Sequence, residues 1–403
     1  MTRAVLMVGG GVQQVDAVHL ARSAGYRVIV SDRNADAPAF AAADERWVVD
    51  GADHAELVRR ALGTPDLAGV FTLTELVEAV AAVAQAASLP GASLDAARAC
   101  QDKSASRARW TEADVPIARG GSVRDAREAH ALYGEIGPDV FVKPARGFGG
   151  RGSGRVANPD DLGGAITRAL EIAPIVVMEE FLEGTHHDVN AVFDGNGTLH
   201  AAGLADRTFA PGRPVELGAS SPTALEPAER EQMLGIVARA ARALGITLGP
   251  VKADLIRTDD GLRLLEMAPR LHGPKGSLGL VPAAEGFEPL LGALRVLTGQ
   301  PIGDTLTPTR ARAATYGALQ AAPGVVTSIE GVDDALALPG VERIWTFVAP
   351  GDRVRSAESS TGVPGYALAS GTDPAEARAR MNAARSRVRI VTEPDRPAHH
   401  DLG

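Results

Sequence analysis

The chain has 403 residues, of which 45% are hydrophobic and 23% are charged, and its formal net charge is −9. The length predicts more than one domain, and the composition is that of a soluble globular protein. The acidic balance and the lack of a long basic run exclude a dedicated nucleic-acid surface, and no run of about 18 apolar residues is available for a membrane-spanning helix.

Residues 1–97 are expected to form a Rossmann-like domain. Apolar segments at 4–8 and 26–31 predict buried strands, and residues 13–24 between them predict a helix. The alternation continues to an alanine-rich helix that ends before Leu89-Pro90-Gly91. This order of strands and helices implies a parallel sheet with right-handed crossovers.

Gly9-Gly10-Gly11 lies between the first strand and the first helix, and Asp32 follows at the distance expected of a dinucleotide-binding fold. Gln14 stands where that motif requires its third glycine, which favours a plain tight turn. Cys100 lies among alanines and is interpreted as a core residue. Because a single cysteine forms no intrachain disulfide, and the first strand lacks the length of a secretion signal, we expect a cytoplasmic protein.

Residues 98–300 are expected to form a central domain with a subdomain at about 115–185. Residues 301–392 alternate short strands with turns before a last helix, which predicts a small α+β domain, and residues 393–403 are predicted to be a flexible tail. The elements expected in the central domain are a helix at 101–113, strands at 140–143, 175–178 and 188–193, a helix at 226–244, a hairpin of strands at 250–256 and 262–267, and a helix at 284–298.

The glycine-rich segment between Lys143 and Arg155 is the first chemical signal. Glycines let backbone N–H groups approach phosphate oxygens, and Lys143 at the end of the preceding strand supplies a positive charge. The residue order is not that of a P-loop. A flexible hairpin tip with solvated arginines is the alternative interpretation.

Asp254 and Glu266 are the second signal, because they lie on the two strands of the predicted hairpin. Antiparallel pairing places two such carboxylates near one cation, and Mg²⁺ typically takes one or two carboxylates together with substrate phosphates. Lys252 is expected on the same face as Asp254. Arg270 follows shortly after Glu266, where its guanidinium suits an oxyanion or a phosphoryl group. The alternative is a surface hairpin with ordinary charges.

Residues 176–184 are the third signal, a buried strand that runs into Glu179 and Glu180. The end of a strand offers backbone donors and acceptors between apolar walls, as an adenine ring requires. Exposed acids at a strand end are the alternative. His186 and His187 are adjacent, so a strand would point them to opposite faces, and a metal site built from both is not expected.

The order and spacing of these motifs resemble the ATP-grasp carboxylate–amine ligases, and the C-terminal segments look most like those of L-amino-acid ligases. The resemblance covers about residues 3–392. It implies an α/β ATP-grasp fold, in which a Rossmann-like parallel-sheet domain precedes a central ATP-binding domain and a small C-terminal α+β domain. The segments that carry it are MVGGGVQQVDAVHLARSAGYRVIVSDRNADAPAFAAAD, Gln101-Asp-Lys103, the glycine loop, Glu179-Glu-Phe-Leu182, Leu265-Glu-Met-Ala-Pro-Arg270, Gly324-Val-Val, Pro350-Gly-Asp352 and Tyr366-Ala-Leu-Ala-Ser-Gly371.

The resemblance also implies roles for individual residues. Asp254 and Glu266 would bind Mg²⁺, and Arg270 and Lys252 would act in catalysis, Arg270 by steadying the acyl phosphate and the tetrahedral species. Arg207 would face the substrate. The loop after Arg270 departs from the family pattern, because it carries His272 and Lys275 where many relatives have small residues, and these two side chains are expected to face the substrate and to meet a second carboxylate. The residues expected to bind ATP are Lys103, Lys143, Gly147, Gly149, Gly150, Gly152, Glu179, Glu180, Leu182, Glu183 and His186.

Two departures from the family pattern concern the nucleotide site. His186 stands where relatives carry the acid that binds the ribose, so this contact is expected to shift to Glu183 or Asp188. Ala268 stands where relatives carry an asparagine after the second metal carboxylate, and this removes one contact to metal or phosphate.

The expected function is an ATP- and Mg²⁺-dependent ligase that activates a carboxylate as an acyl phosphate, couples it to an amine, and releases ADP and phosphate. Its expected substrates are small and amino-acid-like, and its expected state is a homodimer without nucleic-acid or membrane partners. The alternatives are a purine-biosynthesis or biotin-carboxylase-like enzyme of the same fold, and a nucleotide-binding protein without turnover.

Overall fold

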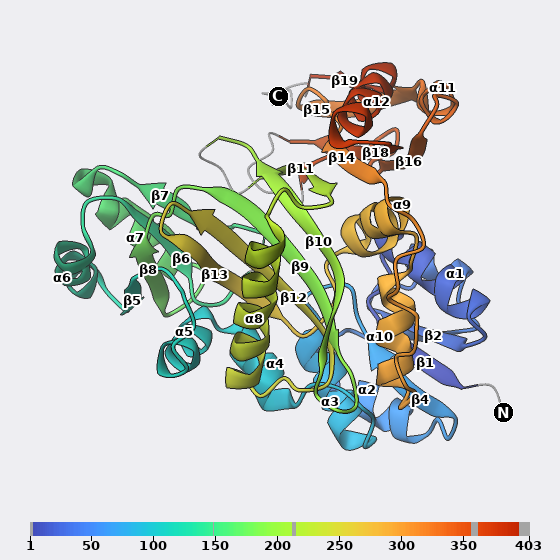
Figure 1. Ribbon diagram of the computed structural model, residues 1–403, viewed down its shortest axis with the longest axis horizontal. Coiled ribbons are helices and arrows are strands. Elements are labelled where there is room, and N and C mark those ends of the chain that lie inside the picture. The colour runs from blue at the N-terminus through green and yellow to red at the C-terminus, as the bar shows by residue number, and fades with distance from the viewer. Residues whose placement is uncertain (1–2, 148, 212–214, 356–361, 395–403) are drawn as a thin grey trace, which may run out of the picture.

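The computed structural model describes residues 3–147, 149–211, 215–355 and 362–394. These residues form a mixed α/β structure with an N-terminal domain, a central domain and a C-terminal domain, which confirms the predicted fold class (Figure 1). None of the helices in the described ranges combines the length and the hydropathy of a membrane span.

The N-terminal domain is built on a four-stranded parallel sheet in the order β3-β2-β1-β4. The glycine turn after the first strand is a structural turn, because the Gly10 N–H donates to Asp32 Oδ2 at 2.7 Å. The elements are β1 (Ala4–Val8), a 3₁₀ turn (Val12–Gln14), α1 (Val15–Ser23), β2 (Arg27–Asp32), a 3₁₀ turn (Pro38–Ala41), β3 (Glu45–Val48), α2 (His54–Leu62), β4 (Leu67–Phe71) and α3 (Val77–Ala86).

Two helices connect this domain to the next, where the sequence predicts only one. Asp102 separates them and caps the second, accepting hydrogen bonds from the Ser104 and Ala105 N–H groups. The predicted domain boundary at residue 97 lies inside the first of the two. These helices are α4 (Leu94–Gln101) and α5 (Lys103–Glu112).

A small antiparallel sheet in the order β5-β8-β6-β7 forms the subdomain that the sequence places at about 115–185. Two helices pack on it around a core that includes Val142, Ile166 and Met178. Its elements are β5 (Gly120–Val123), α6 (Ala126–Ile136), β6 (Val140–Pro144), β7 (Gly154–Val156), a 3₁₀ turn (Pro159–Asp161), α7 (Leu162–Leu170) and β8 (Val176–Glu180).

The largest sheet runs through both the central and the C-terminal domain, in the order β13-β12-β9-β10-β11-β14-β18-β16 (Figure 1). Because neighbouring strands are hydrogen-bonded, the C-terminal strands are held in fixed register with the central ones. The strands are β9 (Thr185–Phe193), β10 (Leu199–Phe209), β11 (Glu216–Ser221), β12 (Gly249–Thr258), β13 (Gly261–Ala268), β14 (Ala313–Ala318), β16 (Val341–Thr346) and β18 (Gly365–Gly371).

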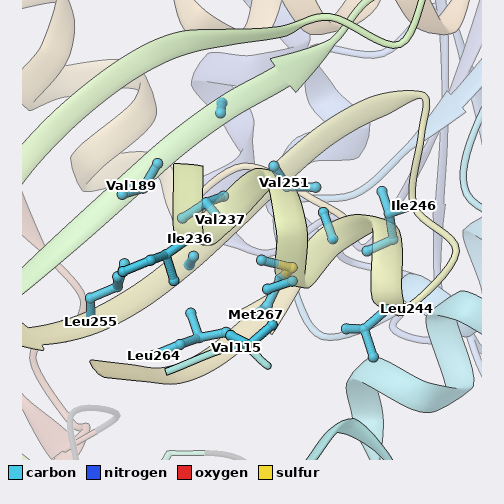
Figure 2. Packing of buried hydrophobic residues seen from close by; sticks show 14 of the residues in the cluster. Val115, Val189, Ile236, Val237, Leu244, Ile246, Val251, Leu255, Leu264 and Met267 are labelled. Atoms are coloured by element: carbon cyan, nitrogen blue, oxygen red, sulfur yellow. The ribbon is translucent and has the colours of Figure 1, made fainter. Parts of the chain in front are cut away.

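Helix α8 (Pro227–Ala243) covers one face of β9, β12 and β13. Ile236 and Val237 of this helix pack on Val189, Val251 and Leu255 of the sheet, as Figure 2 shows. Each such fully buried aliphatic side chain contributes about 1.5–3 kcal/mol to folding. The hairpin is therefore fixed from behind, while its other face is left for the polar groups described below.

The remaining elements surround the C-terminal domain and the connection to it. The helix predicted at 284–298 is two helices, because Gly286 at φ +78° ends the first. These elements are a π-helical turn (Gly276–Leu280), α9 (Val281–Glu285), α10 (Pro289–Leu297), α11 (Val332–Leu336), α12 (Pro374–Arg387) and a three-stranded sheet of β15 (Gly324–Glu330), β17 (Arg353–Val354) and β19 (Arg389–Glu393).

Candidate active site

The hairpin of β12 and β13 pairs Asp254 directly with Glu266. The Lys252 Nζ donates to Asp254 Oδ2 at 2.7 Å, so Lys252 lies on the same face. The opposite neighbour of β12 is β9, and it places Asp188 beside Asp254. Three carboxylates thus lie across three adjacent strands.

The two carboxylates of the hairpin differ in what surrounds them. Asp254 is held by Lys252 and by Arg207, whose Nη1 donates to Oδ1 at 3.1 Å. Burial alone would raise the pKa of Asp254, but these two cations lower it. Glu266 forms no hydrogen bond or ion pair with any side chain in the described ranges, while Lys103 and Lys252 outweigh burial and lower its pKa.

These residues fit a magnesium ion. Glu266 is ionised and has free carboxylate oxygens, and Asp254 lies opposite it, although two cations now bind Asp254. No group of three or more acidic, histidine or cysteine side chains suited to a metal occurs among the described residues. Because Mg²⁺ is usually bound by one or two carboxylates and by substrate phosphates, Glu266 and Asp254 suffice.

A cavity lies next to Glu266, bordered by Lys103 and Gly147. The Lys103 Nζ donates to the Gly147 carbonyl at 3.0 Å, which closes the cavity toward the glycine loop. Gly149, Gly150 and Gly152 have φ angles of +69°, +74° and +67°, a region that other residues rarely adopt. The loop can therefore turn its backbone N–H groups toward an anion beside Lys103.

Gly152 is also required for space. A Cβ atom at this position would lie 2.5 Å from Ile172 Cδ1 and 3.2 Å from Pro144 Cγ. The loop therefore packs against its own subdomain and does not form a solvated hairpin tip, the alternative open from the sequence.

Lys143 and Glu179 form a buried ion pair inside the small subdomain, and Arg107 Nη1 joins Glu179 Oε2 at 2.7 Å. The side chain of Glu180 pairs with Arg119 at 2.7 Å. Both glutamates thus bind arginines of the protein, and their backbone is paired with β5 and β6, so any free backbone group for a ligand must lie beyond them. The Leu182 N–H, two residues further on, forms no hydrogen bond with the backbone or side chains that the structure describes.

The structure separates the two acids expected near a ribose. Glu183 is exposed at the end of this segment, with its Oε1 3.4 Å from Arg155. Asp188 is buried beside Asp254. His186 packs edge-on against Phe209, with 4.8 Å between ring centroids, and burial lowers its pKa.

Glu216 of β11 lies at the centre of a buried cluster where β10, β11, β14 and β18 meet. The Arg207 Nη2 donates to its Oε2 at 2.8 Å, and Tyr316 donates to its other oxygen. The Lys275 Nζ lies 3.5 Å from Oε1. Burial opposes the ionisation of Glu216, but Lys275 and Arg207 outweigh it, so the pKa of Glu216 is well below its ordinary range.

Lys275 also contacts two aromatic rings. Its Nζ lies 3.7 Å from the centroid of the Tyr366 ring and 5.4 Å from that of Tyr316. The rings are nearly perpendicular, with centroids 5.5 Å apart. Burial lowers the pKa of Lys275 although Glu216 opposes this shift.

Several buried polar atoms near these groups have no hydrogen-bond partner in the described part of the chain. Arg270 uses Nη1 for the Leu271 carbonyl and Nη2 for Glu75, and its Nε is unpaired. His272 Nε2 lies 3.1 Å from Asp188 Oδ2, and burial lowers the pKa of His272 so that it is neutral. The atoms near the cluster that lack a partner are Asp188 Oδ1, Arg207 Nε, Arg270 Nε and His272 Nδ1.

Unpaired buried polar atoms cost free energy, and native structures usually provide each with a partner. Four of them around one cluster indicate that a polar ligand completes the site. Since arginine supplies donors and a neutral histidine supplies an acceptor, the ligand has both acceptors and donors.

Sequence reasoning missed Glu216, Tyr316 and Tyr366 as members of this cluster. Glu216 lies in β11, a strand for which no pattern was assigned, and the tyrosines come from strands in the C-terminal domain. Only a proposed pairing of β11 with β14 could have brought them together.

Two family models match the chain. The ATP-binding domain of the carbamoyl-phosphate synthase L chain matches residues 102–303, and the C-terminal domain 2 of L-amino acid ligases matches residues 317–393. The first match spans half of the chain and contains the glycine loop and the carboxylate hairpin.

Solved structures of similar fold include an L-amino acid ligase from Bacillus licheniformis. It has a TM-score of 0.83 at 19% identity, and the match covers 97% of this chain and 99% of that one. An N5-carboxyaminoimidazole ribonucleotide synthetase from Thermotoga maritima has a TM-score of 0.78 at 19% identity, covering 97% of this chain and 100% of that one. At these identities the structures show the fold alone.

Two curated relatives are similar in sequence. The protein y4rH of Sinorhizobium fredii is 29% identical over 297 residues, which is 71% of this chain and 60% of that protein. The formate-dependent phosphoribosylglycinamide formyltransferase of Geobacter metallireducens is 27% identical over 416 residues, which is 96% of this chain and 97% of that enzyme.

Proposed function

The chain belongs to the ATP-grasp ligases, enzymes that use ATP with Mg²⁺ to form C–N bonds and release ADP, and we propose that it joins a carboxylate to an amine on amino-acid-like substrates. The carboxylate would be activated as an acyl phosphate before the amine attacks it. The observation that carries this proposal is that the candidate nucleotide groups and the incomplete buried cluster meet at the hairpin of β12 and β13. Asp254 of this hairpin pairs with Glu266 and also accepts a hydrogen bond from Arg207 of β10.

The nucleotide would lie between the small subdomain and the hairpin. Lys103 and the glycine loop would bind the phosphates, and the backbone near Leu182 would bind the adenine. Glu266 and Asp254 would hold Mg²⁺, which when bound neutralises phosphate charge during the transfer. Lys143 is bound to Glu179 in the structure, so its contact with phosphate requires that this ion pair open.

The substrate carboxylate would attack the γ-phosphoryl group in line, and the amine would then attack the acyl carbon. Arg270 is suited to the developing oxyanion because its Nε is buried and unpaired, and the other guanidinium nitrogens are already fixed. Lys252 holds Asp254 in place from the same strand. The buried cluster excludes water, which would otherwise hydrolyse the acyl phosphate.

An α-amino acid fits the unpaired atoms of the cluster. Arg207 and Arg270 provide donors for a carboxylate, and His272 and Asp188 provide acceptors for an amine. Lys275 adds a cation whose Nζ is held by Glu216 only at 3.5 Å. The second carboxylate of a dicarboxylic substrate would pair with this ammonium group.

The first test is to incubate the protein with ATP, Mg²⁺ and pools of amino acids, and to identify the nucleotide product. ADP and phosphate that form only with particular pools would support the proposal. AMP and pyrophosphate would contradict it.

Substitution of Lys275 by methionine is expected to change substrate preference. The variant keeps the length of the side chain and loses its charge, so kcat/KM for a dicarboxylic substrate should fall about ten- to a hundredfold. The same variant assayed with a neutral amino acid serves as the control and should retain its kcat/KM, as should the KM for ATP. Equal losses for both substrates would show that Lys275 does not read a second carboxylate.

A second candidate within the same fold is the transfer of a one-carbon carboxylate. The formyltransferase relative matches 96% of this chain, which favours this candidate. Release of ADP with formate or bicarbonate and an amine, but with no amino-acid pool, would establish it. Binding of ATP without turnover in any of these assays would support a third candidate, a nucleotide-binding protein, for which Ala268 and His186 are the motivating departures.

The proposal includes a cytoplasmic location, which the single, buried and unpaired Cys100 supports. It also includes a homodimer, since the biotin carboxylase domain of the Hydrogenobacter thermophilus 2-oxoglutarate carboxylase, whose fold is similar, was solved as a dimer. Light scattering of the purified protein tests this state.

A further inference from the structure

The opposite face of β9 carries a second polar cluster. Thr185 and His187 are two positions apart on this strand and share one face, whereas His186 and Asp188 occupy the other. Thr185 is exposed, and His187 is only 2% exposed. None of the roles proposed above uses Thr185 or His187.

Three side chains of this cluster form a chain of hydrogen bonds. Thr185 Oγ1 lies 2.7 Å from His187 Nε2, and His187 Nδ1 lies 2.7 Å from Asp206 Oδ1. Strand pairing places Asp206 of β10 directly opposite His187. This is the arrangement of a hydroxyl nucleophile, its base and the carboxylate that orients the base.

The direction of these hydrogen bonds follows from Asp206. The Thr223 hydroxyl donates to Oδ1 at 2.5 Å, and the Ala224 N–H donates to Oδ2 at 2.8 Å. Burial raises the pKa of Asp206, but the hydrogen bonds from His187 and Thr223 outweigh it, so Asp206 is ionised. An ionised carboxylate only accepts, so His187 Nδ1 carries hydrogen. In the neutral imidazole of this tautomer, Nε2 presents a lone pair, to which Thr185 donates its hydroxyl hydrogen.

We propose that Thr185 is an activated hydroxyl at which this chain accepts an acyl group from an acyl phosphate. Thr185 Oγ1 forms a bond to the acyl carbon, and the bond from that carbon to the phosphate oxygen breaks, so that phosphate leaves. His187 Nε2 takes the hydroxyl proton and passes it to the leaving phosphate or to water. Asp206 is a positioning residue, because it acts through His187.

The chain contains a matched threonine that lacks a base. Thr167 in α7 is also exposed, and its hydroxyl donates to the Gly163 carbonyl at 2.9 Å. This bond is to a backbone oxygen, which does not take up a proton. Thr167 therefore reports the background reactivity of an exposed threonine in the same molecule.

The experiment uses the full chain with acetyl phosphate, without ATP, and measures the acetylation of Thr185 and Thr167 by peptide mass spectrometry. We expect Thr185 to acetylate about 10²-fold faster than Thr167, which is the usual contribution of a positioned base. His187→Asn should remove this advantage, and Thr185→Ser should keep it.

Equal rates at the two threonines in the unsubstituted protein would overturn the proposal, and this comparison requires no variant to fold. The proposal would also be overturned if His187→Asn left the acetylation rate of Thr185 unchanged. This conclusion requires that the thermal unfolding of the variant match that of the parent. Thr185→Val keeps the side-chain volume and removes the hydroxyl. If this variant unfolds like the parent and its peptide is no longer acetylated, the acyl group of the parent is on the Thr185 hydroxyl. The assay needs no ligase turnover, and its outcome is independent of the proposed function.

Discussion

Substitution of Glu266 by glutamine is expected to lower kcat by about 10²- to 10³-fold, which corresponds to a loss of several kcal/mol of stabilisation of the transition state. Glu266 is the carboxylate of the hairpin with no hydrogen bond or ion pair to a side chain in the described ranges. Glutamine keeps the shape and removes the negative charge. Lys103 and Lys252 stabilise this negative charge, and a magnesium ion requires it.

The measurement is ADP release as a function of Mg²⁺ concentration, and the variant should also need more Mg²⁺ for half-maximal rate. Glu112→Gln is the control, since Glu112 is exposed at the end of α5 and the same chemical change there should have no effect. A Glu266→Gln enzyme that stays within about threefold of the parent kcat at every Mg²⁺ concentration would remove Glu266 from the metal site.

Local sequence was sufficient to predict the hairpin itself, but its turn does not fix the pairing of the two carboxylates. The register set by the turn at Asp259-Asp260-Gly261 pairs Leu255 with Leu264, and a register shift between Asp254 and Leu255 then brings Asp254 opposite Glu266. The glycine loop could also be predicted from local sequence, because its positive φ angles are ones that glycine adopts readily and other residues rarely adopt.

The buried cluster was less predictable, because long-range pairing assembles it. Glu216 and Tyr316 are a hundred residues apart and meet because β11 pairs with β14. Neither strand has a periodic pattern that points to the other. Arg207 and Lys275 were predicted to face the substrate, but Glu216, with which both pair, was not identified.

Ion pairing also decides which predicted groups are free. Lys143 ends its strand, as the sequence suggests, but its ammonium group is bound to Glu179 inside the small subdomain. Glu179 and Glu180 both carry their charge toward arginines. Sequence reports the positions of charges along the chain, and only the packing reports which of them neutralise one another.

Arg207→Met is expected to reduce the free energy of unfolding by about 3–5 kcal/mol, the usual cost of removing one partner from a buried ion pair. Arg207 joins Glu216 at 2.8 Å and Asp254 at 3.1 Å, and all three side chains are largely buried. Methionine fills part of the volume but leaves two carboxylates with less compensation. Urea denaturation at pH 7 measures the change.

Arg257→Met is the matched control. Arg257 lies on β12 of the same sheet and pairs with Glu229 at 2.5 Å, but half of its side chain is exposed. Surface pairs of this kind contribute about 0–1 kcal/mol, so this variant should unfold almost like the parent. The double variant Arg207→Met/Glu216→Gln should recover part of the loss, because it removes the charge that Arg207 neutralises.

The pH dependence separates the loss of charge from the loss of packing. In the parent the pKa of Glu216 is lowered, so its contribution to stability is complete above its unfolded pKa of about 4.3 and is lost as the pH falls through the folded value. Without Arg207 the pKa of Glu216 rises. As the pH falls, protonation of Glu216 then removes a buried charge that has lost its partner, which makes the variant less unstable. The difference in stability between parent and Arg207→Met should therefore narrow as the pH falls from 7 toward 4. A difference that stays constant with pH would mean that Arg207 stabilises the cluster by its packing on Phe209, over whose ring the guanidinium lies at 4.8 Å, and not by its charge.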